Sequence, residues 1–364
     1  MTPKRPGRIT FAWLILVPLV LALLVVGLGL LARRGSSPSA AIPTPIEHAT
    51  SLPLDGRGSP SAAAPTQTEP AISPPLATAP ATQPLSPTIP RVGHIFEIVM
   101  ENKSYPSIIG SSSAPYINSL AQQYGLATNF YAIRHPSLPN YLALTSGSTH
   151  GVTSDCTNCF VDAPNLADQI ESAGKTWRAY MEGMPKPCFV GDQGRYRQKH
   201  NPFIYYDSIR KNPARCSNIV PFTQFAQDLA ANALPDYVWI TPDMCNDMHD
   251  CAIEDGDAWL QTWVTKILAS PAWQQNGVLF ITFDESFASD TSGCCEVAKG
   301  GHIVTLVISP LGKPAYQSTI AYDHYSLLGT IEELWDLPKL EGAACACAPP
   351  MVDFFTMAPS GLQP

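Results

Sequence analysis

The sequence predicts an α/β fold from about residue 91 onward, with a mostly parallel sheet and helices on both faces. Short apolar runs typical of buried strands alternate there with segments of helical periodicity. The chain has 364 residues, 45% hydrophobic and only 14% charged, so it can bury a sizeable core. In such folds ligands bind outside the carboxyl ends of the strands, and residues just after the strands are therefore the candidate site.

The first 34 residues have the pattern of a membrane-directing segment. The basic stretch MTPKRPGR precedes an apolar run over residues 11–32, which is long enough to cross a bilayer as a helix. The run ends in Arg33 and Arg34 without a clear cleavage site, so a single-pass anchor in the cell membrane is favoured over a cleaved signal peptide and a secreted protein. Lys4, Arg5 and Arg8 before the apolar run slightly outnumber Arg33 and Arg34 after it. This bias predicts that the N-terminus stays in the cytoplasm and that the rest of the chain is extracytoplasmic.

We predict that residues 35–90 form a disordered linker. They are dominated by Pro, Ser, Ala and Thr and have too few large apolar side chains to form a core. The remaining domain is acidic. Residues 91–364 hold 16 lysines and arginines against 27 aspartates and glutamates, a composition that argues against nucleic-acid binding. We place the folded domain at residues 91–357.

All ten cysteines lie after residue 150, which together with the predicted export favours disulfides. Local pairs such as Cys156 with Cys159 and Cys245 with Cys251 are possible, but spacing does not fix the connectivity. The alternative is a zinc site built on CTNC, which needs a second pair of ligands.

Each predicted element rests on a local pattern. Buried strands are expected at 94–100, 237–241, 278–283 and 303–309, each a β-branched or aromatic run. Helices are expected at 114–125, 163–175, 222–234, 257–270 and 325–337. Gly125 and Gly174 occupy positions typical of helix ends.

Polar side chains gather at the ends of these strands, in MENKSY, PDMCNDMHDC, FDES and KGGH. Any single one has an ordinary structural explanation, such as a turn or a helix cap. Several carboxylates at one sheet edge repel one another unless a cation neutralises them, so the set predicts a metal site. The members are Glu101, Asn102, Asp243, Asn246, Asp247, His249, Asp250, Asp284, Glu285 and His302.

A hydroxyl in HPSLPNYLALTSGSTHG, residues 135–151, has two interpretations. Ser137 stands between two prolines and before a short predicted helix. Taken alone, the position favours a helix cap. A nucleophile presented at a helix N-terminus, where backbone N–H groups receive a phosphate, is the alternative.

Six motifs in order resemble the phosphoesterase family of bacterial acid phosphatases and phospholipases C, within the alkaline-phosphatase superfamily. They are IVMENKSY, RHPSLPNYLALTSG, NDMHDC, FDES, GGHIVTLVISP and YDHYSLLGTIEELWDLP, between about His94 and Pro338. SLPNY is also similar to the nucleophile segment of nucleotide pyrophosphatases/phosphodiesterases. The resemblance implies an alkaline-phosphatase-like fold and makes Ser137 the expected nucleophile.

The resemblance also implies roles for other residues. One divalent cation is expected on Glu101, Asn102, Ser137, Asp284 and Glu285; oxygen ligands favour Ca²⁺, Mg²⁺ or Mn²⁺, with zinc possible. A second metal is not expected, since the spacing around NDMHDC departs from the superfamily pattern. Substrate contacts are expected from Asn140, His249 and His302, with Asp247 orienting one of the histidines.

Other histidines are less directly indicated. His135 and His324 are expected to line the substrate pocket, although Asp323 in the same motif is equally a helix cap. We expect structural or solvent-exposed positions for His48, His94, His150 and His200. A solvated basic loop is the favoured interpretation of Arg195, Arg197 and Lys199, over contact with an anionic substrate.

The predicted function is metal-dependent hydrolysis of phosphate esters through a phosphoseryl intermediate, most simply acid-phosphatase-like and acting on monoesters. A phospholipase C-type phosphodiesterase is the alternative within the family. A membrane-tethered, non-catalytic cation-binding module is the alternative of another class.

Overall fold

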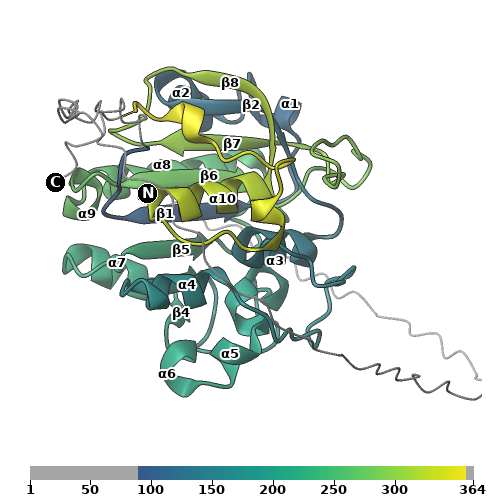
Figure 1. Ribbon diagram of the computed structural model, residues 1–364, viewed down its shortest axis with the longest axis vertical. Helices are drawn as coiled ribbons and strands as arrows, with labels where there is room; N and C mark the ends of the chain where they lie inside the picture. The colour runs from purple at the N-terminus through teal and green to yellow at the C-terminus, as the bar shows by residue number, and fades with distance from the viewer. Residues whose placement is uncertain (1–88, 358–364) are drawn as a thin grey trace, which may run out of the picture. The chain divides into compact units, whose positions relative to one another are not determined.

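The computed structural model describes residues 89–357 (Figure 1). The predicted membrane anchor and most of the predicted linker lie outside these residues. Within 89–357, no helix combines the length and the apolar character needed to cross a membrane.

One sheet organises the described residues, and its strands run in the order β4-β3-β5-β1-β6-β7-β2-β8 (Figure 1). The strands are β1 (Ile95–Met100), β2 (Gly125–Tyr131), β3 (Trp177–Met181), β4 (Ile219–Pro221), β5 (Tyr237–Thr241), β6 (Val278–Phe283), β7 (His302–Ile308) and β8 (Gln317–Asp323). All neighbours pair in parallel except β7, which is antiparallel to β6 and to β2. The predicted α/β fold is confirmed, with this one reversed strand.

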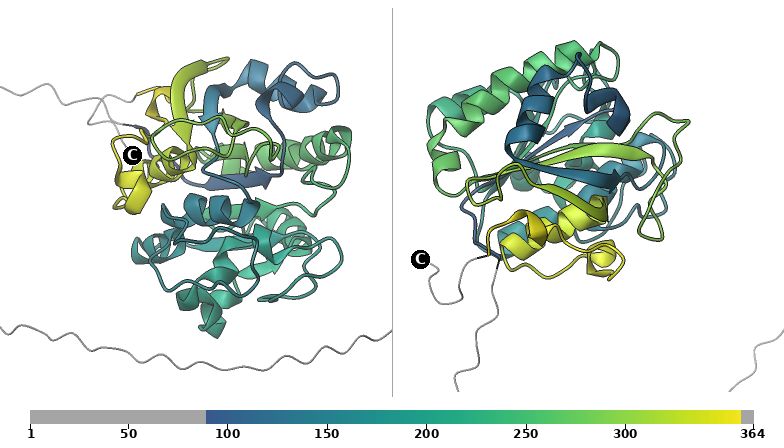
Figure 2. Two further views of the ribbon diagram at one scale, coloured as in Figure 1. Left: turned by 90° about the vertical axis from the view of Figure 1, so that its right-hand side faces the viewer. Right: turned by 90° about the horizontal axis from the view of Figure 1, so that it is seen from above.

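Helices cover both faces of the sheet, as the view from above shows (Figure 2, right). They are α1 (Tyr105–Ile108), α2 (Pro115–Gln123), α3 (Ser137–Ser146), α4 (Leu166–Ser172), α5 (Asp207–Arg210), α6 (Pro213–Cys216), α7 (Thr223–Ala230), α8 (Ile253–Leu268), α9 (Pro271–Gln274) and α10 (His324–Leu334). Helices α2 and α8 pack together on one face, and α3 packs with α10 on the other. The central strands β1, β5 and β6 are buried along their whole length.

The sequence analysis did not predict four of the strands, which are β2, β3, β4 and β8. Four of the seven residues of β8 are exposed, three of them in a row, as suits an edge strand, and β2 mixes polar with apolar residues. Gly125 does not end a helix: it opens β2, where a Cβ atom would lie 2.5 Å from the Phe354 ring. The glycine is needed for this close approach. Gly174 does follow a helix, with a φ of 71°.

The cysteines of the described residues form five disulfides, and none is free. The pairs are Cys156–Cys159, Cys188–Cys216, Cys245–Cys251, Cys294–Cys295 and Cys345–Cys347. The prediction of disulfides is therefore confirmed. The zinc alternative at CTNC is wrong, because both of its sulfurs are bonded to each other.

A carboxyl group lies inside the core on the central strand. Glu97 of β1 is fully buried, one of its oxygens accepts a 2.7 Å hydrogen bond from the Tyr237 hydroxyl, and the other has no hydrogen-bond partner. Burial raises the pKa of Glu97 from 4.5 to about 8, against the opposing effect of the Tyr237 hydrogen bond. The folded protein therefore holds this proton more tightly than the unfolded chain does.

We predict that Glu97 makes the protein less stable as pH rises from the unfolded pKa of 4.5 through the folded value of about 8. Above the unfolded pKa the unfolded state loses its proton first, which favours unfolding. Glu97→Gln keeps an acceptor for Tyr237 and removes this effect. Urea unfolding in chelator should give similar stabilities near pH 5 and an advantage for the variant of about 4 kcal/mol near pH 8. Parallel pH profiles for the two proteins would contradict the assignment.

Candidate active site

The carboxyl end of β1 supplies the first part of the site. Glu101 directly follows the strand and is fully buried. Asn102 adopts a left-handed backbone, with a φ of 51°, which asparagine tolerates better than most residues. Its backbone N–H donates to Asp284 at 3.1 Å and its side-chain amide donates to Glu101 at 2.7 Å. The turn after β1 is thus bonded to the end of β6.

The end of β6 adds a second pair of carboxylates. Asp284 accepts a 2.6 Å hydrogen bond from the backbone N–H of Glu285, while its other oxygen is buried without a hydrogen-bond partner. Burial, followed by the charges of Glu101 and Glu285, raises the pKa of Asp284 well above its usual range. Burial is also the first cause of a raised pKa at Glu285. These carboxylates lie close enough together to oppose one another's ionisation.

Ser137 lies between the carboxylates of the two strands. Its Oγ is 3.3 Å from Glu101 and 3.4 Å from Glu285. Ser137 is the first residue of α3, the N-cap position is Pro136, and no side chain at that position caps the helix. The interpretation of Ser137 as a simple helix cap is therefore wrong, because its hydroxyl faces the carboxylates.

A lysine completes the surroundings of the hydroxyl. Lys199 Nζ lies 3.2 Å from Ser137 Oγ and 3.0 Å from an Asp155 oxygen. Burial favours the neutral amine, but the charges of Glu101 and Asp155 outweigh it and raise the pKa of Lys199. The sequence favoured a solvated basic loop for Lys199, and this interpretation is wrong. Lys199 lies in the short 3₁₀ helix Gln198–His200, and its side chain is only 16% exposed.

The next residue forms a buried ion pair. His200 Nε2 lies 2.9 Å from Glu101 and Nδ1 lies 3.5 Å from Asp247, and the imidazole is 3% exposed. Burial opposes the charged imidazole, yet the Glu101 carboxylate raises the pKa of His200 to about 9. In return, and against the effect of its own burial, the charge of His200 lowers the pKa of Glu101 to about 2. Of the two positions that the sequence analysis allowed for His200, structural or solvent-exposed, the buried ion pair fits the structural one.

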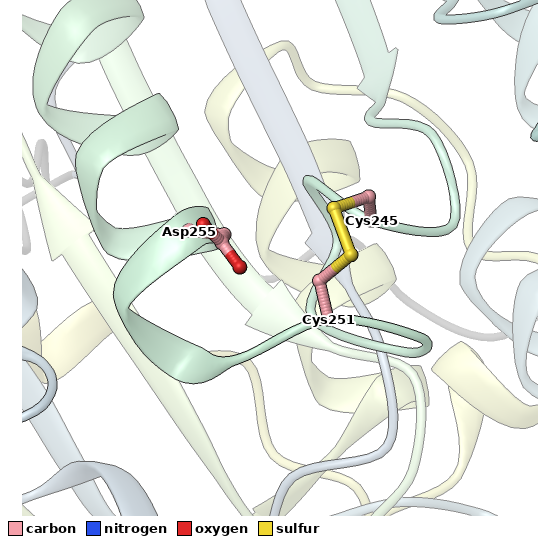
Figure 3. Close-up of side chains that lie close together, drawn as sticks. All are labelled: Cys245, Cys251 and Asp255. Atoms are coloured by element: carbon pink, nitrogen blue, oxygen red, sulfur yellow. A yellow bond between two sulfur atoms is a disulfide. The ribbon is translucent and has the colours of Figure 1, made fainter. Parts of the chain in front are cut away.

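Asp247 and His249 lie on a loop closed by a disulfide. The Cys245–Cys251 bond joins the loop ends beside the first turn of α8, where Asp255 lies (Figure 3). Asp255 accepts a hydrogen bond from the Ala252 N–H at 3.2 Å, so it caps the helix. These three side chains lie close together, but a disulfide offers no thiolate to a metal ion. The bond instead fixes the loop.

Within that loop the two predicted residues have different surroundings. Asp247 is fully buried, accepts from the His249 backbone N–H at 2.7 Å and faces His200. The His249 ring is partly exposed, lies 6.2 Å from the His200 ring and contacts Asp250 at 2.8 Å. Asp247 therefore faces His200 rather than the His249 or His302 ring that the sequence analysis named.

Three other residues of the predicted motifs have hydrogen-bond partners within the fold, and contact of His135 and His324 with substrate stays a prediction. His135 Nδ1 lies 2.6 Å from Glu285, and this hydrogen bond raises the pKa of His135. His324 Nε2 lies 2.6 Å from the backbone oxygen of Asp284, and burial lowers the pKa of His324 to about 4. Asp323 caps α10 by accepting from the Ser326 N–H at 3.0 Å, so the capping interpretation is confirmed for that residue.

Asn140 braces the turn before Ser137. Its amide donates to Arg134 O at 2.6 Å and to Pro136 O at 3.3 Å, and its oxygen accepts from the Arg134 N–H at 3.0 Å. These bonds occupy the amide that was expected to donate to a phosphate oxygen. A contact between Asn140 and phosphate stays a prediction.

His302 lies at the same edge because β7 runs antiparallel to its neighbours and begins there. Its ring stacks on Tyr105 at 4.3 Å and on Tyr131 at 5.1 Å, and Nε2 lies 2.8 Å from Thr128 O. Burial lowers the pKa of His302. The structure gives this ring a packing role, and its expected contact with phosphate stays a prediction.

Comparison with known proteins identifies the family. Residues 110–338 match the phosphoesterase family. The chain is 33% identical over 278 residues to an acid phosphatase of Aspergillus fumigatus, covering 72% of this chain and 60% of that protein. It is 35% identical over 272 residues to a phosphatidylinositol-3-phosphatase of Mycobacterium tuberculosis, covering 73% and 84%. The chain therefore belongs to the phosphoesterase family, as its motifs predicted, although it spans less than two thirds of the Aspergillus protein.

One solved structure agrees with this chain at the level of the fold, and a second is similar to a lesser degree. The lipoteichoic acid synthase LtaP of Listeria monocytogenes matches with a TM-score of 0.52 at 10% identity, covering 72% of this chain and 76% of that chain. A protein of the alkaline phosphatase superfamily from Vibrio parahaemolyticus matches with a TM-score of 0.49 at 14% identity, covering 71% and 72%. Identities this low concern the fold alone.

We predict that His200 is required to keep Glu101 and Asp247 charged in the folded protein. His200→Leu removes the buried cation that these two carboxylates share, at a cost of about 3 kcal/mol or more. Urea unfolding at neutral pH measures the loss. The matched control is His249→Leu, which removes a partly exposed imidazole from the same region and should cost less than about 1 kcal/mol. Similar losses in the two variants would contradict the ion-pair interpretation.

Proposed function

We propose that this protein hydrolyses phosphate monoesters by transferring the phosphoryl group to Ser137. One observation carries the proposal, namely the surroundings of Ser137, the first residue of helix α3. Its Oγ lies 3.2 Å from the Lys199 ammonium and within 3.4 Å of the Glu101 and Glu285 carboxylates. Such a hydroxyl is placed for attack on phosphorus, with an ammonium beside it to favour the deprotonated oxygen.

The side chains around Ser137 suit a divalent cation. Glu101, Asp284 and Glu285 offer several carboxylate oxygens, and one Asp284 oxygen is buried without a hydrogen-bond partner. We propose that Glu101, Asn102, Ser137, Asp284 and Glu285 would hold one divalent cation, and their oxygen atoms favour Ca²⁺, Mg²⁺ or Mn²⁺ over zinc. When bound, it would supply positive charge that activates the hydroxyl and offsets the charge of the phosphate.

The chain's own groups account for the remaining steps. Ser137 Oγ passes its proton to one of the two carboxylates that it contacts and forms the bond to phosphorus while the ester P–O bond breaks, and the leaving oxygen takes up a proton. His249 is the candidate donor, since its ring is partly exposed and borders the buried His200. Water then hydrolyses the phosphoserine and restores the hydroxyl. Lys199 stays beside the oxygen that attacks and later leaves.

Monoesters are the proposed substrates because the relatives described above are an acid phosphatase and a phosphatidylinositol-3-phosphatase by name. A phospholipase C-type activity on diesters and a non-catalytic cation-binding module are the other outcomes of a substrate test. We also propose that the domain works outside the cytoplasm, tethered by its N-terminal segment or secreted. The five disulfides support an oxidising compartment.

The nucleophile prediction is tested with Ser137→Ala. We expect the variant to fold and to lose turnover of para-nitrophenyl phosphate by several orders of magnitude, since the first displacement has no acceptor. Acid quenching of the wild type should trap phosphate on the peptide that contains Ser137. Ser146→Ala is a control on the same helix, because that hydroxyl bonds to Leu142 O and not to the carboxylates. Retention by Ser137→Ala of more than about a tenth of wild-type turnover would argue against the nucleophile.

The metal prediction uses Asp284→Asn. In chelator this variant should unfold at the same temperature as the wild type or higher, because it removes one of three opposed carboxylates. Adding Mn²⁺ or Mg²⁺ should raise the melting temperature of the wild type but not that of the variant. Elemental analysis should find less metal in the variant. Equal metal content and equal shifts in the two proteins would exclude Asp284 as a ligand.

A further inference from the structure

Asp155 lies outside every motif identified in the sequence. Its carboxylate contacts both the Lys199 ammonium beside the Ser137 hydroxyl and the first turn of the helix that carries Ser137. One oxygen lies 3.0 Å from Lys199 Nζ. The other accepts a 3.0 Å hydrogen bond from the backbone N–H of Leu138, in the first turn of α3. A single side chain thus joins the helix that carries Ser137 to the ammonium beside it.

A disulfide and two side-chain hydrogen bonds hold the backbone that follows Asp155. The Cys156–Cys159 disulfide closes the turn that follows it. The Gln198 amide donates to Thr157 O at 2.9 Å, and the Tyr205 hydroxyl donates to Cys156 O at 2.9 Å. Gln198 directly precedes Lys199, so the segments that carry the carboxylate and the ammonium are bonded to each other.

A lysine near several carboxylates needs such a partner to stay beside the hydroxyl. The Lys199 side chain has a flexible four-carbon stem and is attracted by Glu101 and Asp284 as well as by Asp155. Without Asp155, the ammonium would be free to move onto the carboxylates that face the other side of the hydroxyl. Asp155 supplies the competing attraction, and the pair is mostly shielded from water, with side chains 16% and 29% exposed.

We propose that Asp155 is a positioning residue for phosphoryl transfer: its carboxylate holds the Lys199 ammonium beside Ser137 Oγ and fixes the first turn of α3 relative to it. The inference rests on the proposed function, because it assigns Asp155 to that same reaction. Asp155 itself is not assigned a contact with Ser137 Oγ or with the phosphorus. It acts through Lys199.

The test separates the two contacts of Asp155. Asp155→Asn keeps an oxygen for the Leu138 N–H but removes the charge that faces Lys199, whereas Asp155→Ala removes both. If Asp155 positions Lys199, Asp155→Asn should lower kcat for para-nitrophenyl phosphate roughly 10- to 100-fold, with KM changed less than about threefold and the melting temperature kept. The matched control is Asp162→Asn, an exposed aspartate of the same segment, which should keep wild-type kinetics.

A second pair of variants asks whether the effect passes through the lysine. In a Lys199→Met background, Asp155→Asn should lower kcat by less than about twofold further, since the group it positions is gone. An equal fold-loss in both backgrounds, or wild-type kcat in Asp155→Asn, would overturn the positioning role while leaving the proposed function intact. If the wild-type chain turned over no phosphoester, the proposed function would fail, and this inference with it.

Discussion

Glu101, Asp284 and Glu285 are buried at one edge of the sheet, and the groups around them are arranged to tolerate that negative charge. His200 lies against Glu101, His135 against Glu285, and the Asn102 backbone against Asp284. Each partner comes from a different part of the chain. The carboxylates therefore tie together β1, β6, the turn before α3 and the 3₁₀ helix Gln198–His200.

The three carboxylates do not have equivalent partners, and this difference affects which of them is ionised. Glu101 has a cationic partner in His200 and stays ionised, whereas Asp284 has only N–H donors and keeps one oxygen without a hydrogen-bond partner. The Ser137 hydroxyl lies where these differences meet, with Lys199 on another side. Added positive charge, whether from protons or from the proposed cation, would lower the repulsion among these carboxylates.

The parts of this arrangement that the sequence predicted are those set by local pattern. Strands β1, β5, β6 and β7 are continuous apolar runs because both of their faces are buried, and residues that follow parallel strands necessarily meet at one edge. Glu101, Asn102, Asp284 and Glu285 were found in this way. Strands β2 and β8 were missed because their polar residues reflect their particular neighbours in the sheet. Propensity alone does not report such neighbours.

Lys199 and His200 were missed for a different reason. They lie in the long connection between β3 and β4, where no periodicity indicates the direction of a side chain. Their place depends on tertiary contacts, such as the bond from Gln198 to Thr157 and the stacking of His200 on Tyr141. The only local signal was a lysine next to a histidine in a basic stretch.

The reversed strand β7 has a consequence for how the site is enclosed. Because β6 and β7 are antiparallel, the segment 284–301 leaves and re-enters the sheet at the same edge and needs no crossover helix (Figure 1). It begins with two of the carboxylates, and its Asp290 carbonyl contacts His135 before the chain returns. Such a connection can change in length or sequence without moving a strand. The residues that border the site after Glu285 can thus change without displacing β6 or β7.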